Sequence, residues 1–232
     1  MLPDRSRVFG VVRNALRDAL ALVLPVECAG CGRVDRGLCV DCLAQLRPEV
    51  VRRRLSDGVA VFSGLDYSGV AARVILAFKE AHRTDVAGRL APALTAALVA
   101  ACDTAEMDTE DAGAAPLLLV PIPGTRAAFR RRGYEPVRVI AGRAGFPLCR
   151  AFAPALAHRA QKSAGQSERA VNVQGAFRLR IPVAGRRVVL IDDVVTTGAT
   201  LVEAARVVRE AGGEVVAAAT VASTPRRSGP LP

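Results

Sequence analysis

Apolar and polar residues alternate along the chain in blocks that are typical of an α/β fold. Apolar runs of strand length lie at 59–68, 117–123, 186–193 and 214–223. Segments with apolar residues at helical spacing lie at 69–82, 85–101, 124–145 and 198–213. Because strands that are separated by helices usually pair in parallel, this order predicts a mainly parallel sheet flanked by helices.

The N-terminal segment predicts an amphipathic helix rather than a signal peptide. Apolar residues recur at helical spacing between Val8 and Val23, and Pro25 closes the segment. Arg17 and Asp18 interrupt the stretch that a signal peptide keeps apolar. The longest apolar run elsewhere, at 91–102, is shorter than the roughly 18 residues of a membrane span. We therefore expect a cytoplasmic protein that is not an integral membrane protein.

The remaining segments complete the expected organisation. Residues 103–115 carry five carboxylates and no basic side chain, which predicts an exposed loop, and residues 175–185 predict a β-hairpin. We expect an N-terminal helix and cysteine module over 1–54, an α/β domain over 55–222, and a flexible tail over 223–232.

The charge balance is strongly basic and consists almost entirely of arginine. Lys and Arg total 32 against 22 Asp and Glu, which gives a formal net charge of +10, and the lysines are Lys79 and Lys162. Guanidinium groups bind phosphate in a bidentate way, so this balance suits phosphate or nucleic-acid contact. A GC-rich genome produces the same bias, so charge alone does not decide the function.

Four of the six cysteines form two CxxC pairs in the segment CAGCGRVDRGLCVDC. These are Cys28, Cys31, Cys39 and Cys42. Four thiolates at this spacing predict a tetrahedral Zn²⁺ site, and four protein ligands leave no open position, so the zinc would be structural. Buried free thiols or disulfides are the alternatives. Cys102 and Cys149 are expected in the core.

Several arginines accompany this cysteine module. They are Arg33, Arg36, Arg47, Arg52, Arg53 and Arg54. They would either contact nucleic acid or lie on a solvated face.

The segment VVLIDDVVTTGATL at 188–201 carries the second chemical signal. An apolar strand ends in Asp192 and Asp193, and a small, hydroxyl-rich loop then opens a helix. Such a loop directs backbone N–H groups at one phosphate, while the carboxylates accept hydrogen bonds from ribose hydroxyls. The pattern favours a receptor for a sugar 5-phosphate over an ordinary capped helix. A Walker-type nucleotide site is excluded because neither lysine lies in a GxxxxGK[ST] context.

VVLIDDVVTTGATL resembles the phosphoribosyl pyrophosphate (PRPP) motif of the type I phosphoribosyltransferases. Together with the four cysteines, the chain resembles the ComF family, the competence and GntX-like relatives of those enzymes. The resemblance covers most of 20–221 and includes LPVECAGCG, ILAFK, LVPIPGTRAAFRRRGY and the R…Q…R-x-x-N-V-x-G-A-F stretch that ends at Phe177. It implies a phosphoribosyltransferase-type α/β domain behind a zinc knuckle.

The resemblance also implies roles for individual residues. The residues implied to bind PRPP are Asp192, Asp193, Val194, Val195, Thr196, Thr197, Gly198, Ala199 and Thr200. Candidates for the pyrophosphate are Lys79, Arg126, Arg130, Arg131 and Arg132. Candidates on a segment that covers the site are Arg159, Lys162, Arg169 and Asn172. Mg²⁺ is expected with PRPP, bound through the oxygens of PRPP and water.

The chain departs from the family at one motif. Where the family usually reads R-G-F-N-Q, this chain has Arg132-Gly133-Tyr134-Glu135-Pro136. The change removes two amide side chains and one backbone donor, so contacts through those amides are not carried over. No base-binding hood is recognisable. The aromatic residues considered for base stacking are Tyr67, Phe78, Tyr134 and Phe152.

Three functions are compatible with these features. The first is Mg²⁺-dependent phosphoribosyl transfer from PRPP to an unidentified nitrogen acceptor. The second, implied by the resemblance, is handling of single-stranded DNA by the competence machinery during DNA uptake. The third is PRPP sensing without turnover. The motifs favour a PRPP-binding protein of the competence type.

Overall fold

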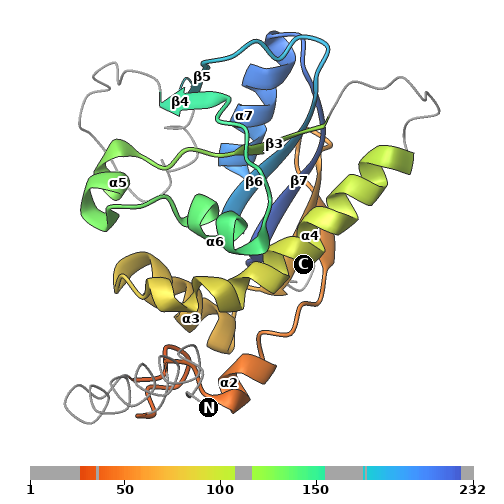
Figure 1. The fold of residues 1–232 in the computed structure, drawn as a ribbon. Helices are drawn as coiled ribbons and strands as arrows, with labels where there is room; N and C mark the ends of the chain where they lie inside the picture. Colours follow the sequence, from red (N-terminus) through yellow and green to blue (C-terminus); the bar gives the residue numbers. More distant parts are fainter. Residues whose placement is uncertain (1–26, 35–36, 108–116, 155–174, 176, 226–232) are drawn as a thin grey trace, which may run out of the picture.

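A five-stranded, mostly parallel sheet forms the centre of the structure. The computed structural model describes residues 27–34, 37–107, 117–154, 175 and 177–225 (Figure 1). The strand order is β1 (Val51–Arg54), β2 (Ala60–Asp66), β7 (Glu214–Ser223), β6 (Arg187–Val195) and β3 (Leu117–Pro121). β2, β7, β6 and β3 run parallel, and β1 pairs antiparallel with β2 at the edge. The predicted α/β fold is confirmed.

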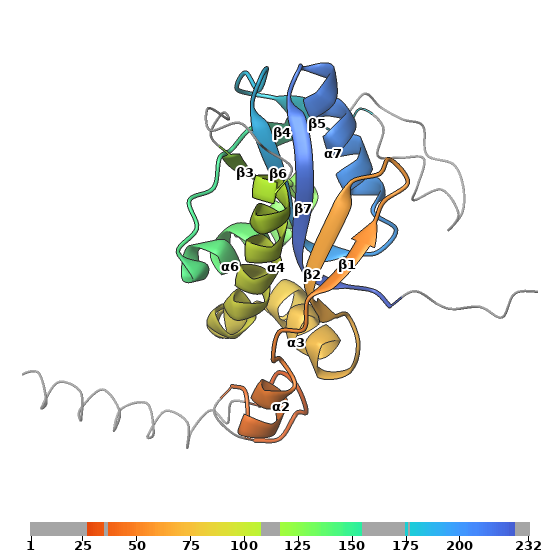
Figure 2. The same cartoon turned by 90° about the vertical axis from the view of Figure 1, so that its right-hand side faces the viewer.

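Helices cover both faces of this sheet. The helices are α3 (Gly69–Glu80), α4 (Ala87–Met107), α5 (Arg126–Arg132), α6 (Pro136–Ala144) and α7 (Ala199–Glu210), preceded by the short η1 (Thr84–Val86). Alternate β6 residues serve opposite faces: Val189 and Ile191 join the core under α3, α4 and α6, whereas Val188 and Leu190 join the core under α7. Figure 2 shows α4 and α7 on opposite sides of β7.

α4 is the longest helix in the described part of the chain. Thr84–Ala105 is long and apolar enough to cross a membrane by length and composition, but half of that window is buried in the fold. α4 packs against β2, β7 and α6, as a core helix does. Its close packing on β2 requires Gly64, where a Cβ would lie 2.0 Å from the Ala93 carbonyl oxygen.

The predicted start of a loop at residue 103 was wrong. α4 continues to Met107, because Ala101 and Ala105 are buried while Asp103 lies exposed on the opposite side of the helix. The rest of that segment, 108–115, lies outside the described residues, as do the N-terminal helix and the tail from 226 onward.

Two other boundaries differ from the prediction. Residues 51–54, assigned above to the N-terminal module, form β1 of the main sheet. The predicted hairpin at 175–185 does not form within that segment. Instead β5 (Phe177–Leu179) pairs antiparallel with β4 (Phe152–Pro154).

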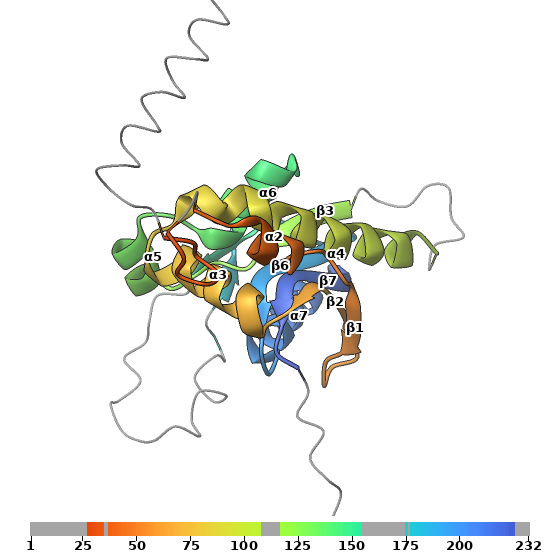
Figure 3. The same cartoon turned by 90° about the horizontal axis from the view of Figure 1, so that it is seen from below.

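The cysteine module packs at one end of the α/β domain. It contains an isolated bridge between Glu27 and Val34 and the short helix α2 (Val40–Ala44). Figures 1 and 3 place α2 near α3. The Arg73 guanidinium on α3 donates to the Gly30 carbonyl, and Arg83 donates to the carbonyls of Glu27 and Gly37 at 2.8 and 3.1 Å. Two arginines therefore hold the module on the domain.

Candidate functional site

The candidate site begins where β6 ends. The apolar part of β6 is buried, and Asp192 and Asp193 follow it, half-buried, at the carboxyl end where open α/β sheets bind ligands. α7 then starts at Ala199, so the loop between them presents backbone N–H groups at a helix N-terminus. Asp193 and Ala199 are six residues apart in sequence, so the acidic pair is followed closely by a helix N-terminus that suits an anion.

The β1–β2 hairpin supports the loop after β6. Arg53 donates from Nη2 to the Thr196 carbonyl oxygen at 2.8 Å. Gly198 adopts a left-handed conformation with φ +84°, and a Cβ there would lie 2.4 Å from Cδ2 of Leu55. Glycine is required at position 198 for two reasons. The left-handed backbone conformation disfavours any other residue, and Leu55 leaves no space for a side chain.

Lys79 on α3 neutralises part of the acidic pair. Its Nζ lies 2.9 Å from Oδ1 of Asp193, and the side chains are 23% and 14% exposed. The Asp193 N–H donates to Oδ1 of Asp192 at 2.8 Å. Burial and the Asp193 carboxylate raise the pKa of Asp192 to about 7, against the lowering effects of that N–H and of Lys79. The pair therefore holds a carboxyl that titrates near neutral pH.

A pocket of about 850 Å³ opens beside the acidic pair. Its wall contains seven of the residues that the sequence predicted to bind PRPP or its pyrophosphate. These are Lys79, Arg126, Arg130, Arg132, Asp192, Asp193 and Thr200. Residues 194–199 do not line this pocket, and neither does Arg131. Arg131 instead lies 3.0 Å from the Glu80 carboxylate, on the exposed side of α5.

Helix α5 carries the arginines that face the pocket. Thr125 caps the helix by accepting a hydrogen bond from the Ala128 N–H at 3.1 Å. Arg132 is anchored, because its Nε donates to the Lys79 carbonyl at 2.8 Å and its Nη2 lies 2.9 Å from Glu80. Arg126 and Arg130 are exposed. The exposed guanidiniums of Arg126 and Arg130 are thus suited to an incoming anion.

Part of the pocket wall consists of residues that the sequence did not predict. Three further arginines line it, namely Arg138, Arg150 and Arg180, together with Phe177. Pairing of β4 with β5 brings these residues together across a gap in sequence, and no local pattern reports that pairing. Arg150 did not belong to any motif.

Of the four aromatic residues considered for base stacking, Phe152 lines the pocket. Phe78 is fully buried in the core, and Tyr134 donates its hydroxyl to the Phe78 carbonyl. Tyr67 packs against the same core. The residues proposed to cover the site, Arg159, Lys162, Arg169 and Asn172, lie outside the described residues.

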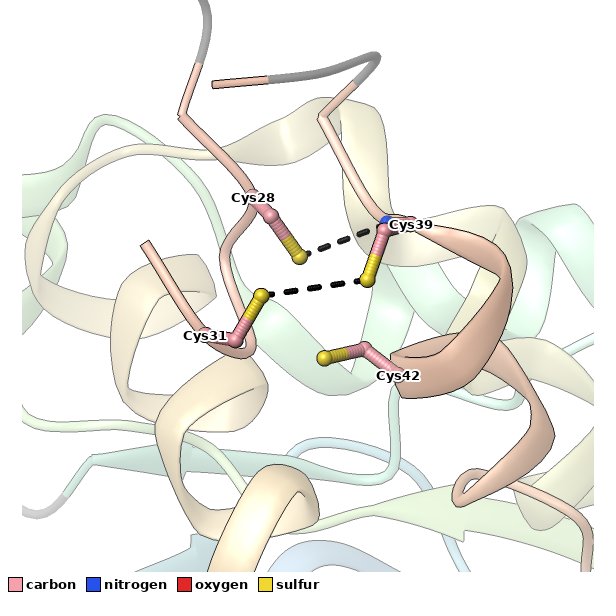
Figure 4. Close-up of side chains that lie close together, drawn as sticks. All are labelled: Cys28, Cys31, Cys39 and Cys42. Atoms are coloured by element: carbon pink, nitrogen blue, oxygen red, sulfur yellow. Dashed lines mark hydrogen bonds between the residues drawn. The ribbon is translucent and has the colours of Figure 1, made fainter. Parts of the chain in front are cut away.

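The four predicted cysteines converge on one point (Figure 4). Their sulfur atoms all lie within 4.8 Å of one another, and Sγ of Cys31 lies 3.8 Å from Sγ of Cys39. A tetrahedral ion with Zn–S bonds of about 2.3 Å holds its sulfurs about 3.8 Å apart. Gly30 makes the approach possible, since a Cβ there would lie 2.6 Å from Sγ of Cys42. The cluster therefore fits a zinc ion.

Thiol electrostatics in the cluster agree with this fit. Burial acts to raise the pKa of Cys28, but N–H groups of Cys39, Cys31 and Gly30 outweigh it and lower the pKa to about 6. Burial and the neighbouring thiols raise the pKa of Cys42 to about 12. Four adjacent thiols ionise together when a cation compensates their charge. Cys102 and Cys149, expected in the core, are half-buried.

Comparisons with known proteins agree with this arrangement. Residues 129–231 match the family model of the phosphoribosyl transferase domain. The DNA utilization protein YhgH of Escherichia coli is 49% identical over 45 residues, which are 19% of this chain and 20% of YhgH. The orotate phosphoribosyltransferase of Methanopyrus kandleri is 39% identical over 79 residues, which are 34% of this chain and 35% of that enzyme.

The chain thus matches about a fifth to a third of the length of these relatives. A crystal structure of a hypoxanthine phosphoribosyltransferase from Staphylococcus aureus aligns with a TM-score of 0.31 and 15% identity, over 64% of this chain and 70% of that one. Residues 129–231 are thus similar to phosphoribosyl transferase domains, and a cluster of four cysteines precedes them in this chain.

Proposed function

We propose that the pocket beside β6 binds PRPP with Mg²⁺ and that the protein transfers its phosphoribosyl group to an acceptor. The observation that carries this proposal is the combination of Asp192, Asp193 and Lys79 with a helix N-terminus at Ala199. Carboxylates suit ribose hydroxyls, and a helix N-terminus suits a phosphate. The phosphoribosyl transferase domain match covers this whole combination except Lys79.

Each part of PRPP has residues of matching chemistry. Asp192 and Asp193 accept hydrogen bonds from the ribose hydroxyls. The loop Val194–Thr200, which meets the pocket wall at Thr200, binds the 5-phosphate at the edge of the pocket through backbone N–H groups and hydroxyls. Arg126, Arg130 and Arg132 face the pyrophosphate, whose charge grows as the C1–O bond breaks. Arg131 is left out of this set because it does not line the pocket.

The proposed function includes two metal ions. Mg²⁺ fits a site that combines a carboxylate pair with the oxygens of PRPP and water, and it would compensate charge on the leaving pyrophosphate. Zn²⁺ fits the cluster of Cys28, Cys31, Cys39 and Cys42 as a structural ion. We propose the module before β1 as a zinc-holding unit and β1 to β7 as the phosphoribosyl domain.

We also propose that the activity serves the handling of incoming single-stranded DNA in the cytoplasm. The support is the similarity to a protein named for DNA utilization, and the exposed arginines around the module and on β1, which include Arg33, Arg47, Arg52 and Arg54. Binding through these groups would weaken steeply with salt. Absence of single-stranded DNA affinity at low salt would remove this part of the proposal.

The direct test is ligand-induced thermal stabilisation in zinc-replete protein. Mg²⁺ with PRPP at about a hundred times its dissociation constant raises stability by about 2.7 kcal/mol. We expect this increase in the wild type and in an Asp103→Asn control, and not in an Asp192→Asn/Asp193→Asn variant. Ribose 5-phosphate serves as the control for the sugar phosphate alone. No increase at millimolar PRPP would overturn the proposal.

Turnover separates an enzyme from a sensor. Pyrophosphate release with any member of a nitrogen-acceptor panel would establish phosphoribosyl transfer. PRPP binding without pyrophosphate release across a broad panel would instead establish a PRPP sensor.

A further inference from the structure

The three consecutive arginines of β1 lie on two different faces of the sheet. Arg52 pairs with Phe62 in the β1–β2 register, and its guanidinium lies 5.6 Å from the centre of that ring. Arg53 pairs with Val61, whose side chain belongs to the core under α7. Successive side chains of a strand alternate between its faces, so Arg53 lies on the α7 face and its two arginine neighbours lie on the other.

The β1–β2 hairpin contacts both the loop after β6 and the helix that follows it. Arg53 donates from Nη2 to the Thr196 carbonyl oxygen at 2.8 Å, and Leu55 occupies the space beside the start of α7. At the turn of the hairpin, Oδ2 of Asp57 lies 2.7 Å from Nη1 of Arg209, in the last turn of α7. Figure 2 shows the hairpin beside α7. The hairpin therefore holds the loop at one end and the helix at the other.

Carbonyl oxygens of the loop after β6 are bound by other groups of the protein. The carbonyls of Val195 and Gly198 accept hydrogen bonds from backbone N–H groups at 3.0 and 2.9 Å. The Thr196 carbonyl lies between them in sequence and accepts from the Arg53 side chain. Of these three carbonyls, that of Thr196 is the one held by a side chain, so a single substitution can release it.

The orientation of the peptide between Thr196 and Thr197 decides whether it attracts or repels an anion. A trans peptide directs its C=O and its N–H in opposite directions, so the bond from Arg53 to the Thr196 carbonyl directs the Thr197 N–H away from Arg53. An N–H attracts a phosphate, whereas a carbonyl oxygen in the same place would repel it. The guanidinium also polarises the peptide, which strengthens the N–H as a donor.

We propose that Arg53 is a positioning residue for the 5-phosphate of PRPP, because it holds the Thr196 carbonyl away from the ligand. The inference rests on the proposed function, in which the loop Val194–Thr200 binds that phosphate. Arg53 does not line the pocket and acts through the loop. It should therefore affect binding of the sugar-phosphate end of the ligand and not binding of the pyrophosphate end.

Calorimetric titration with different parts of PRPP tests this role. We expect Arg53→Gln to weaken binding of ribose 5-phosphate, and of PRPP with Mg²⁺, about tenfold or more, and to leave binding of pyrophosphate with Mg²⁺ nearly unchanged. Arg53→Lys, which keeps a cationic donor, should recover part of the loss. Arg143→Gln, which replaces an exposed arginine on α6, should change none of these affinities. An equal loss for all three ligands would indicate general loosening of the fold and would overturn the assignment, as would unchanged binding of ribose 5-phosphate.

The carbonyl carbon resonance of Thr196 in NMR spectra gives a readout that does not depend on affinity. Arg53→Gln should move this resonance in the ligand-free protein, because the carbonyl loses its donor, and Arg143→Gln should not. In the wild type, ribose 5-phosphate should shift the Thr197 N–H resonance and leave the Thr196 carbonyl resonance in place. If the ligand moves the wild-type carbonyl resonance to its position in Arg53→Gln, Arg53 leaves Thr196 to bind the phosphate itself, and the positioning role is wrong.

Binding to the wild type keeps the two proposals apart. If PRPP and ribose 5-phosphate bind the wild type and Arg53→Gln equally well, the proposed function stands and the role of Arg53 is wrong. If neither ligand binds the wild type, the proposed function fails, and the role of Arg53 fails with it.

Discussion

Lys79 and Asp193 form a 2.9 Å ion pair that joins two segments 114 residues apart in sequence. Lys79 lies in the last turn of α3, and Asp193 lies near the end of β6. The same helix carries Arg73, which donates to the Gly30 carbonyl in the cysteine module. One helix therefore connects the cysteine cluster with the acidic end of the pocket.

Replacing Lys79 tests whether its charge sets the state of the acidic pair. In Lys79→Met, Asp193 loses its partner and two adjacent carboxylates repel each other, so we expect PRPP affinity to fall about tenfold or more. Lys79→Arg should recover part of the loss. Arg33→Gln, which removes an exposed pair with Asp41, is the matched control. Calorimetric titration with Mg²⁺ and PRPP measures the effect, and unchanged affinity in Lys79→Met would contradict the assigned role.

The ionised carboxylate of Asp192 should lower the free energy of unfolding near neutral pH. Its pKa is raised to about 7 in the folded chain from an ordinary value near 3.8. Because the folded state binds the extra proton in this window, stability should fall as pH rises from about 4 to about 7 and then level off. Asp192→Asn removes the penalty, so we expect it to stabilise the protein by roughly 2–4 kcal/mol above pH 7 and not below pH 4.

Urea unfolding at pH 4 and pH 8 measures this difference. Asp103→Asn, an exposed carboxylate on α4, should leave the free energy of unfolding nearly unchanged at both pH values. An Asp192→Asn variant that is less stable at pH 8 would show that the carboxylate is stabilising in the folded chain and would refute the argument.

Gly198 should not tolerate a side chain. Alanine would have to adopt φ +84° and would meet Leu55 Cδ2 at 2.4 Å. We expect Gly198→Ala to destabilise the protein by about 1–3 kcal/mol and to weaken PRPP binding. Adding Leu55→Ala should relieve the contact but not the backbone strain, so a double-mutant cycle should show favourable coupling. Gly142→Ala, in an exposed helical position with open space, should instead stabilise by up to about 1 kcal/mol.

Local sequence patterns predicted the elements that depend on local chemistry. The apolar run that ends in Asp192 and Asp193 predicted β6 and the loop after it, and the CxxC spacing predicted the cysteine cluster. Both signals lie within a few residues of the features they describe. The alternation of a strand, the need for a glycine and the spacing of metal ligands each involve only a few neighbouring residues. Features of this kind can therefore be predicted from the local sequence.

Long-range pairing limited the rest of the prediction. β4 and β5 pair across a gap of more than twenty residues, so nothing near Arg150 or Arg180 indicates that they share a pocket. α5 shows a second limit. Arg130, Arg131 and Arg132 are consecutive and therefore project about 100° apart around the helix, so Arg130 and Arg132 line the pocket and Arg131 does not. Composition marks such a run as basic but does not say which member faces a ligand.

Removal of metal should unfold the cysteine module and loosen α3. The module is small, and among its described residues before β1 the buried side chains are Cys28, Cys39, Cys42 and Leu46, so little apolar surface replaces a lost ion. We expect about one zinc per chain, a lower melting temperature after chelation, and loss of the metal in Cys39→Ser. Cys149→Ser, which removes a half-buried cysteine outside the cluster, should keep the zinc.

The pH dependence of zinc retention has a defined sign. Zinc binds thiolates, so binding releases protons and affinity rises with pH. Because burial holds the pKa of Cys42 at about 12 without a metal, the gain should continue above neutral pH. Competition with a chromophoric chelator at pH 6, 7 and 8 measures it. Affinity that does not change across this range would mean that the thiols are already ionised without the ion, and full retention of zinc in Cys39→Ser would place the metal elsewhere.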